Sequence, residues 1–319
     1  MGRMGRIAQM NEFELIRRIT RSLPGNKSVV VGPGDDCAVL DVGLADRLLL
    51  FKTDAVVEGV HFTPETPPGK VGHKALGRCL SDVAAMAGTP TAALVTLGLP
   101  PNFEIGYVEG LYKGMNALAR RHEVAIVGGE TTTNPERLWV SVALVGWVAR
   151  GKAVLRSGAE AGDALFVTGE LGGSLGGKHL EFEPRLVEAR WLAGQFPIHA
   201  MLDLSDGLAG DLRHIMQASR VGAELLSSSI PISAEARRAA KADSSAKPPL
   251  AAALTDGEDF ELLFTVAGRQ AVPLLDAWKA RFPALRLTCI GKITGKEGLA
   301  IRDKQGVRPL TDHGYAHFA

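Results

Sequence analysis

The apolar residues of this chain follow two alternating spacings, one typical of helices and one typical of strands. Residues 71–87 place Leu76, Leu80 and Val83 on one helical face, and Gly88 follows as a stop signal. Short, nearly continuous apolar runs between such helices predict strands. In the first half of the chain the pattern predicts helices over 11–22, 71–87 and 104–121 and strands over 28–32, 47–53, 92–99, 123–128 and 138–149.

The second half opens near Gly151 and continues the alternation. It predicts strands over 164–168, 200–204, 261–266 and 287–293, helices over 185–194, 207–219 and 269–281, and a glycine-rich turn over 169–177. The composition of 234–249 indicates a solvated helix end followed by a flexible loop. The mixture of strands and helices indicates an α/β (α+β) fold. Because a single core rarely grows beyond about 250–300 residues, 319 residues predict two domains, 1–150 and 151–319.

The run 138–149 is apolar at both alternating sets of positions. Val140, Val142 and Leu144 fall on one face of the predicted strand, and Trp139 and Trp147 fall on the other. A strand that is apolar on both faces must be covered on both. Helices of the same domain can cover one face, so we expect a second copy of the chain to cover the other. The run is too short to cross a bilayer, which needs about 20 residues.

Composition and charge exclude several classes of protein. Hydrophobic residues make up 46% and charged residues 22%, as in an ordinary globular protein. Lys and Arg number 36 against 35 Asp and Glu, so the balance favours neither nucleic acid nor a membrane surface as a partner. The three cysteines, Cys37, Cys79 and Cys289, are widely spaced, which argues against a disulfide framework or a zinc site. With no apolar segment typical of a signal peptide at the N-terminus, we expect a cytoplasmic protein.

Acidic residues recur in short strings at the ends of predicted elements, most of them beside glycine. The strings are Asp35-Asp36, Thr53-Asp54, Ser81-Asp82, Gly129-Glu130, Asp203-Leu204-Ser205-Asp206 and Asp256-Gly257-Glu258-Asp259. One such residue alone has a plainer explanation: Asp206 could cap a helix, and Asp82 could belong to a buried ion pair. Many converging carboxylates with few His and no Cys neighbours favour a hard cation, and Mg²⁺ bound by a few carboxylates usually also binds substrate phosphates. The strings therefore predict several Mg²⁺ ions and a polyphosphate substrate.

Eight motifs, in order, resemble those of the thiamine-monophosphate kinase family, within the aminoimidazole-ribonucleotide-synthetase-like ATP-binding superfamily. They are GDDCAVL (34–40), TDAVVEGVHF (53–62), KALGRCLSDVAAMAGTP (74–90), GGETT (128–132), RSGAEAGD (156–163), DLSDGL (203–208), GEDFELLF (257–264) and GYAHF (314–318). The resemblance covers nearly the whole chain. It implies an N-terminal ATP- and Mg²⁺-binding domain that builds a barrel across a homodimer, followed by a C-terminal α/β domain.

The resemblance also implies an activity and a set of site residues. The enzymes of this family transfer the γ-phosphoryl group of ATP to thiamine monophosphate and produce thiamine diphosphate. By motif position, the Mg²⁺ ligands would be Asp36, Thr53, Asp54, Asp82, Glu130, Asp203 and Asp206; Gly129, Glu130, Arg156 and Ser205 would contact ATP; His61, Glu258 and Tyr315 would contact the acceptor; and Asp54, Asp82 and Arg156 would be catalytic. The acceptor is already a phosphate oxyanion, so such a reaction needs alignment and charge neutralisation rather than a general base.

The chain departs from the family pattern at several positions. Glu130 stands where the family has Asp, and the segment 174–179 is shortened. Lys52 stands where a small hydroxyl residue is common, and its side chain either replaces part of a metal ion's charge or points away. Two alternatives therefore stay open: another superfamily enzyme, similar to aminoimidazole ribonucleotide synthetase or to a hydrogenase-maturation dehydratase, and a degenerate nucleotide-binding protein without turnover.

Overall fold

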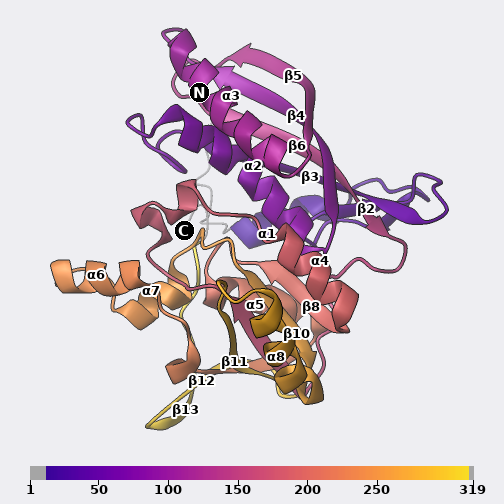
Figure 1. Cartoon of the computed structure of the whole chain (residues 1–319), viewed down its shortest axis with the longest axis vertical. Coiled ribbons are helices and arrows are strands. Elements are labelled where there is room, and N and C mark those ends of the chain that lie inside the picture. The colour runs from indigo at the N-terminus through magenta and orange to yellow at the C-terminus, as the bar shows by residue number, and fades with distance from the viewer. Residues whose placement is uncertain (1–11, 316–319) are drawn as a thin grey trace, which may run out of the picture.

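The computed structural model describes residues 12–315, which form two halves, each built on one β-sheet (Figure 1). The first half contains α1 (Glu12–Thr20), β1 (Val29–Val31), β2 (Ala38–Leu40), β3 (Arg47–Val57), α2 (Pro68–Ala85), β4 (Thr89–Leu99), α3 (Ile105–Arg121), β5 (Ala125–Thr133) and β6 (Trp139–Ala149). Its six-stranded sheet has the order β1-β2-β3-β6-β4-β5. Neighbouring strands are antiparallel except for β4 and β5, which are parallel.

The first sheet is covered by helix on one face. Val140, Val142 and Leu144 of β6 are fully buried on the face that packs against α2. The opposite face, here called the open face, carries Phe51 of β3 and Leu94 of β4, which pair with Val145 and Ala143 of β6 and are about half exposed. One half of the two-face prediction for 138–149 is thus confirmed, and cover for the open face stays a prediction.

The second half is a sheet between two layers of helices. Its main elements are β7 (Asp163–Thr168), α4 (Leu186–Gln195), β8 (Ile198–Asp203), α5 (Leu208–Ser219), β9 (Gly222–Leu226), α6 (Ala234–Ala242), α7 (Pro249–Thr255), β10 (Leu262–Ala267), α8 (Ala271–Arg281), β11 (Leu287–Thr294), β12 (Leu299–Asp303) and β13 (Gly306–Pro309). The sheet order is β13-β12-β9-β11-β7-β10-β8, and only the β9–β12 pair is parallel.

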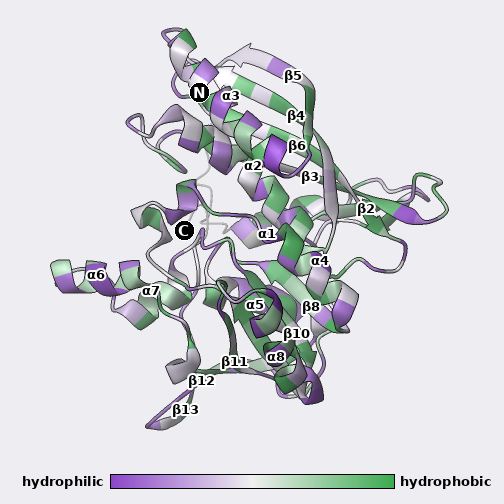
Figure 2. Ribbon diagram, viewed as in Figure 1, coloured by the Kyte–Doolittle hydropathy of each residue, from purple (hydrophilic) through white to green (hydrophobic). Residues whose placement is uncertain are grey.

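Strand β7 shows why this sheet needs cover on both sides. Phe166 packs into the core that includes Trp278 of α8, whereas Leu165 and Val167 pack into a second core that includes Leu212 of α5. All six residues of β7 are buried, so the strand is a nearly continuous apolar run. In Figure 2 the central strands of the sheets carry mostly hydrophobic residues, while α6 alternates between hydrophilic and hydrophobic residues.

The fold class and most predicted elements are confirmed, with differences at the edges. Strand 47–53 extends to Val57, and the short elements β2, β9, β12, β13 and α7 are additional to the prediction. Helix 11–22 is present as α1, but Ile16 and Ile19 are 44% and 56% exposed and do not form the expected buried face. Residue 11 and the side chain of Phe13 lie outside the described part of the chain. The domain boundary at 150/151 stays a prediction. In the described range 12–315, no helix is long and apolar enough to cross a membrane.

Candidate active site

Three carboxylates from distant parts of the sequence meet between the two halves. Asp36 follows β1, Asp82 lies on α2 and Asp203 ends β8. One ligand oxygen from each lies within 4.8 Å of the other two, and all three residues are buried. Ser81, the neighbour of Asp82 on α2, donates a hydrogen bond of 2.5 Å to Oδ2 of Asp203 and so joins the two halves at this point. We call Asp36, Asp82 and Asp203 the carboxylate centre.

The carboxylate centre has the properties of a cation site. Burial and the nearby charge of Asp36 raise the pKa of Asp203 to about 7, and burial is the main reason that the pKa of Asp82 is also raised. Oδ2 of Asp36 is buried and accepts no hydrogen bond from any described residue. A buried oxygen without a partner is costly, and oxygen donors are what Mg²⁺ prefers. These three residues therefore fit a Mg²⁺ ion.

Arg156 approaches the carboxylate centre from the segment that joins the two halves. Its Nη2 lies 2.6 Å from Oδ1 of Asp36, and its backbone N–H donates to Oδ2 of Asp35 at 3.1 Å. Burial opposes the charge of Arg156, but the attraction of Asp36 outweighs it and raises the pKa of the guanidinium. The side chain is 23% exposed, so a guanidinium suited to bidentate phosphate binding stands at the edge of the carboxylate centre.

Three charged side chains of β3 and α2 lie around Asp82 of the carboxylate centre. Lys52 and Asp54 lie two residues apart on one face of β3, and Arg78 and Asp82 lie four residues apart on one face of α2. Lys52 Nζ is 2.8 Å from Oδ1 of Asp82 and 3.9 Å from Oδ2 of Asp54, and Arg78 Nε is 3.7 Å from the same Asp54 oxygen. Of the two orientations open for Lys52, the structure therefore has the one that points toward the acids.

Thr53 lies on the other side of the same strand. Successive residues of a strand point to opposite faces, and the hydroxyl of Thr53 lies 3.4 Å from that of Ser141 on the open face. Its side chain is not brought to the carboxylate centre. The hydroxyl of Thr53 is thus turned away from the carboxylate centre, and the assignment of Thr53 as a metal ligand stays a prediction.

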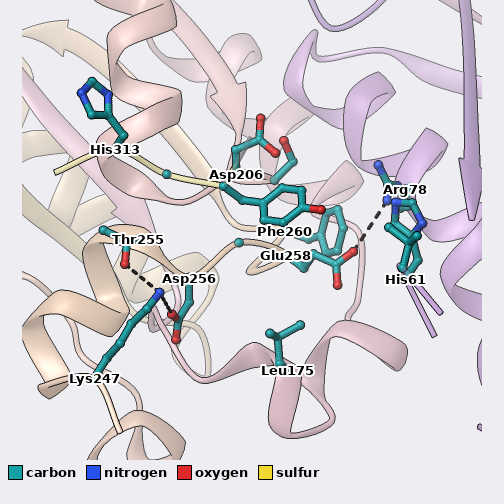
Figure 3. A pocket seen from close by; sticks show the side chains of 15 residues that line it. His61, Arg78, Leu175, Asp206, Lys247, Thr255, Asp256, Glu258, Phe260 and His313 are labelled. Atoms are coloured by element: carbon teal, nitrogen blue, oxygen red, sulfur yellow. Dashed lines mark hydrogen bonds and ion pairs between the residues drawn. The ribbon is translucent and has the colours of Figure 1, made fainter. Parts of the chain in front are cut away.

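Beside the carboxylate centre lies a pocket of about 460 Å³. It is lined by residues of both halves (Figure 3): His61 and Arg78 from the first, and Ser205, Asp206, Glu258, Phe260 and Tyr315 from the second. All three predicted acceptor contacts, His61, Glu258 and Tyr315, therefore line one pocket. Phe260 was not predicted as a site residue; its ring stacks on Phe182 with centroids 3.9 Å apart and gives the pocket an aromatic wall.

Glu258 is held in the pocket wall by an unusual backbone and by buried cations. Its φ is +63°, and its N–H donates to the carbonyl of Ser205 at 2.7 Å. Oε2 lies 2.6 Å from Nζ of the fully buried Lys74 and 3.0 Å from Nδ1 of His179. Burial would raise the pKa of Glu258, but the hydrogen bond with His179 and the charge of Lys74 outweigh it and lower that pKa to about 2. Glu258 is therefore ionised at neutral pH.

Lys74 and His179 were missed as site residues, although the sequence contains a signal for Lys74. Lys74, Arg78 and Asp82 follow one another at intervals of four, so they form one charged stripe along an otherwise buried helix. A buried stripe of this kind must find charged partners elsewhere in the fold. No spacing in the sequence connects His179 to Glu258, because the contact forms only through the tertiary fold.

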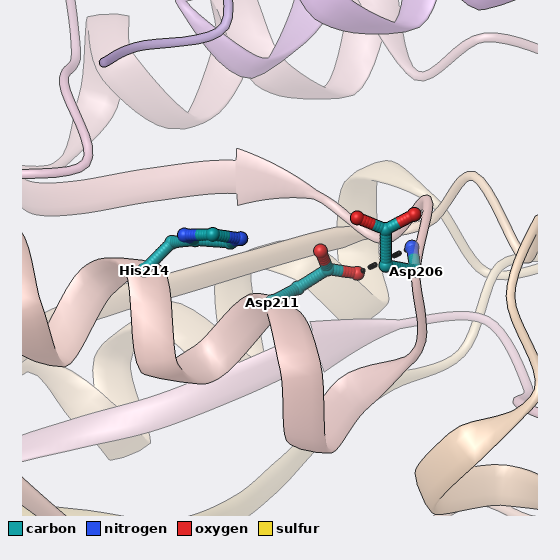
Figure 4. A group of neighbouring side chains, drawn as sticks. All are labelled: Asp206, Asp211 and His214. Carbon is teal, nitrogen blue, oxygen red and sulfur yellow. Dashed lines mark hydrogen bonds between the residues drawn. The ribbon is translucent and has the colours of Figure 1, made fainter. Parts of the chain in front are cut away.

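Asp206 belongs to a second group, with Asp211 and His214 of α5 (Figure 4). Oδ2 of Asp211 accepts the N–H groups of Asp206 and Gly207 at 3.0 and 3.1 Å, and so satisfies backbone donors at the start of α5. Gly207, not Asp206, is the N-cap residue. Burial is the main cause that lowers the pKa of His214 to about 4. The helix-cap explanation for Asp206 is therefore wrong, and its carboxylate lines the pocket instead.

Gly129 and Glu130 lie away from the carboxylate centre in the single chain. Both are on β5, the outermost strand, and Glu130 pairs with Thr96 of β4 on an exposed stretch. A Cβ atom at Gly129 would lie 1.7 Å from the carbonyl oxygen of Val95, so only glycine fits there. Strands β6 and β4 lie between β5 and β3, so β5 is three strand spacings from β3. At the usual spacing this is a distance of roughly 14 Å between the two strands. Their roles toward ATP and metal stay predictions.

The C-terminal segment is fixed beside the pocket by Arg213 of α5. Its guanidinium donates to the carbonyls of Leu310 and Asp312, each at 2.7 Å, and the N–H of Tyr315 donates to the carbonyl of Asp206 at 2.8 Å. A Cβ atom at Gly314 would lie 2.2 Å from that same carbonyl, so glycine is required for the close approach. Arg213 therefore positions the residues that end the pocket.

Replacing Arg213 with methionine should raise the KM for the acceptor by about 10-fold, the effect of about 1.4 kcal/mol, and leave the KM for ATP unchanged. Steady-state kinetics with each substrate varied in turn would measure both values. Arg237→Met is the matched control, because Arg237 is exposed on α6. Equal increases in both KM values would contradict a positioning role that is limited to the acceptor end of the site.

Comparison with known proteins identifies the family of this chain. The family model described as AIR synthase related protein, N-terminal domain, matches residues 34–148, and the C-terminal domain model matches 160–304. A thiamine-monophosphate kinase of Rhodopirellula baltica is 42% identical over 291 residues, 89% of each chain. That of Bacillus subtilis is 34% identical and covers 97% of this chain and 100% of its own. The chain belongs to the thiamine-monophosphate kinase family.

Solved structures agree with this family, and they also include a protein of a different family that shares only the fold. The structure of AaThiL complexed with AMPPCP and TMP has a TM-score of 0.83 and 32% identity, and the match covers 99% of this chain and 100% of that one. The Escherichia coli protein HypE, a hydrogenase maturation protein, has a TM-score of 0.70 at 20% identity, which shows the shared fold alone. The higher identities lie with the thiamine-monophosphate kinase family, as the eight motifs predicted.

Proposed function

We propose that this protein transfers the γ-phosphoryl group of ATP to thiamine monophosphate, producing ADP and thiamine diphosphate. The observation that carries the proposal is one pocket, lined by residues of both halves, that contains all three predicted acceptor contacts, His61, Glu258 and Tyr315. Among family members, the structure with a TM-score of 0.83 contains AMPPCP, an ATP analogue, together with TMP. The direct test is formation of thiamine diphosphate from the two substrates.

The reaction exchanges one phosphorus–oxygen bond for another. The bond from the γ-phosphorus to the bridging oxygen of ADP breaks, and a bond from that phosphorus to an oxygen of the acceptor phosphate forms. Both reactants are anions, so the site has to neutralise charge and align them rather than remove a proton. Two guanidinium groups can contribute to this neutralisation. That of Arg156 lies beside Asp36, and that of Arg78 lies in the wall of the pocket.

We propose that Mg²⁺ completes the site. Asp36, Asp82 and Asp203 would hold it, with Asp54 and Asp206 nearby. When bound, Mg²⁺ would neutralise phosphate charge and separate the phosphates from the carboxylates. The residues themselves fix where the phosphates can lie: the carboxylate centre lies at one end, the pocket at the other, and Arg78 reaches both Asp54 and Glu258.

The pocket suits an acceptor that is cationic and aromatic at one end. The thiazolium ring of thiamine monophosphate carries a positive charge, and its aminopyrimidine forms hydrogen bonds. Phe260 offers an aromatic surface, and the ionised Glu258 offers a carboxylate beside it. We propose that these two residues recognise the acceptor rings and that His61, whose Nδ1 accepts the N–H of Val57, contacts the phosphate.

We also propose a homodimer formed through the open face. In the single chain, Phe51 and Leu94 are about half exposed, and Trp139 and Trp147 are only partly buried. Sedimentation should show a species of twice 33.8 kDa at micromolar concentration. Phe51→Glu, which would place a charge at the interface, should shift the equilibrium to the monomer. A wild-type protein that sediments only as the monomer would contradict the proposal.

The place of action and the boundary between the halves are proposals too. We propose that the enzyme works in the cytoplasm, which agrees with three cysteines that are all free. We propose the division into an ATP-binding, dimer-forming domain over 1–150 and an α/β domain over 151–319.

A further inference from the structure

The side chain of Lys52 enters the active site from the middle of the first sheet. Strand β3 pairs with β6 along its whole length, where Lys52 lies opposite Leu144, and with β2 over the three residues that precede Lys52. The backbone at this position is thus fixed, and the side chain is only 21% exposed. Its Nζ hydrogen-bonds to Asp82 at 2.8 Å and lies 3.9 Å from Asp54. A cation tethered in this way is a permanent part of the site.

The other cations of the site have partners elsewhere. Arg156 pairs with Asp36, and Arg78 lies between Asp54 and Glu258. Among the described residues, only Lys52 forms an ion pair with Asp82. The charge of Lys52 is also close enough to Asp203 to favour the ionised form of that carboxylate. Lys52 therefore supplies positive charge to Asp82, the carboxylate with which neither arginine forms an ion pair.

We propose that Lys52 is a resident cation of the active site. Its Nζ takes the position between Asp82 and Asp54 that a divalent ion would otherwise occupy, so the protein binds one divalent ion fewer than the same carboxylates would bind without it. The inference rests on the proposed function, because it concerns the ions that accompany ATP at this site.

The geometry allows one cation at this position, not two. Asp54 and Asp82 both lie within 4 Å of Nζ. A divalent ion attracted to both carboxylates would be repelled by the charge of Nζ, which lies within 4 Å of an oxygen of each. Asp82 also belongs to the carboxylate centre with Asp36 and Asp203, so Lys52 displaces one ion without closing the whole site.

Counting bound ions tests the proposal directly. Mn²⁺ binding in the presence of the ATP analogue AMPPCP would be measured by equilibrium dialysis for the wild type, for Lys52→Met and for Lys113→Met. Lys52→Met keeps the length of the side chain and removes its charge, and Lys113 is exposed on α3. We expect one additional Mn²⁺ per chain in Lys52→Met and the wild-type number in Lys113→Met. The same number in all three proteins would overturn the proposal.

Stability gives a second measurement that does not depend on counting. Without its cation, Asp82 is left as a buried and uncompensated charge, so Lys52→Met should unfold at a lower Tm than the wild type in EDTA. Mn²⁺ should raise the Tm of Lys52→Met more than that of the wild type. If Lys52→Met does not fold, Lys52→Thr replaces it in the experiment, because a hydroxyl residue is common at this position in the family. Mn²⁺ should then raise the Tm of Lys52→Thr more than that of the wild type. An equal rise for wild type and variant would contradict the proposal.

Failure of this inference can be told from failure of the proposed function. If the wild type forms thiamine diphosphate and the ion counts are equal, only the role of Lys52 is wrong. If the wild type binds Mn²⁺ and AMPPCP but forms no thiamine diphosphate, the proposed function is wrong, and the ion counts still decide the role of Lys52.

Discussion

Asp82→Asn should lower kcat by about 100- to 1,000-fold, the usual effect of removing one preorganised charge from the reacting centre. Asp82 is the carboxylate that connects the others: it contacts Lys52 on one side and belongs to the carboxylate centre with Asp36 and Asp203 on the other. The loss should appear at saturating Mg²⁺, because an asparagine cannot supply the missing negative charge at any metal concentration.

The same substitution should change stability little. It removes a charged hydrogen bond to Lys52, which costs about 1–3 kcal/mol, and it also relieves the repulsion between buried carboxylates. Thermal unfolding would be compared with kcat for Asp82→Asn and for the control Asp276→Asn, which lies exposed on α8. Wild-type turnover of Asp82→Asn would contradict the assignment of Asp82 to the reacting centre.

Glu258→Gln should raise the KM for thiamine monophosphate by about 10- to 100-fold, with a much smaller change in the KM for ATP. The reason is that Glu258 lines the acceptor pocket and is ionised there, whereas the carboxylate centre is formed by other residues. Glu297→Gln, an exposed change of the same chemistry, is the control. Equal increases in both KM values would instead assign Glu258 to the scaffold, through its contacts with Lys74 and His179.

The pH dependence of stability gives an independent check on Glu258. Its pKa is about 2 in the folded protein, below its usual value of 4.5, so ionised Glu258 stabilises the fold. The stabilisation is complete above about pH 4.5 and is lost as the pH falls toward 2. The advantage of the wild type over Glu258→Gln in the free energy of unfolding should therefore shrink between pH 4.5 and 2. An advantage independent of pH in that range would contradict the ionised state of Glu258.

The sequence predicted the members of the carboxylate centre better than their surroundings. Asp36 follows a strand and Asp203 ends one, and such positions are where strands deliver side chains to a shared edge. Asp82 lies inside α2, and its signal is a carboxylate in a short acidic string on an otherwise apolar helix face. Which face a residue takes is harder to predict. Thr53 and Asp54 are neighbours in one motif, yet the period of two in a strand sends their side chains to opposite faces of the sheet.

The parts that escaped prediction depend on long-range packing. Lys74 approaches Glu258 only because α2 of the first half packs against the second half. His179 reaches Glu258 across 79 residues of sequence, through the packing of the second half itself. Phe260 becomes part of the site through a left-handed backbone, with φ of +50°, and through its stacking on Phe182. The edge strand β13 and its neighbour β12 are short and partly exposed, so their apolar periodicity is weak.

The central claim is that this chain phosphorylates thiamine monophosphate. Purified protein would be incubated with ATP and Mg²⁺, with and without thiamine monophosphate, and the products would be separated by chromatography and quantified. The account predicts equal amounts of ADP and thiamine diphosphate when the acceptor is present and almost no ADP when it is absent. Release of ADP that does not depend on thiamine monophosphate, or bound ATP with no product at all, would contradict it.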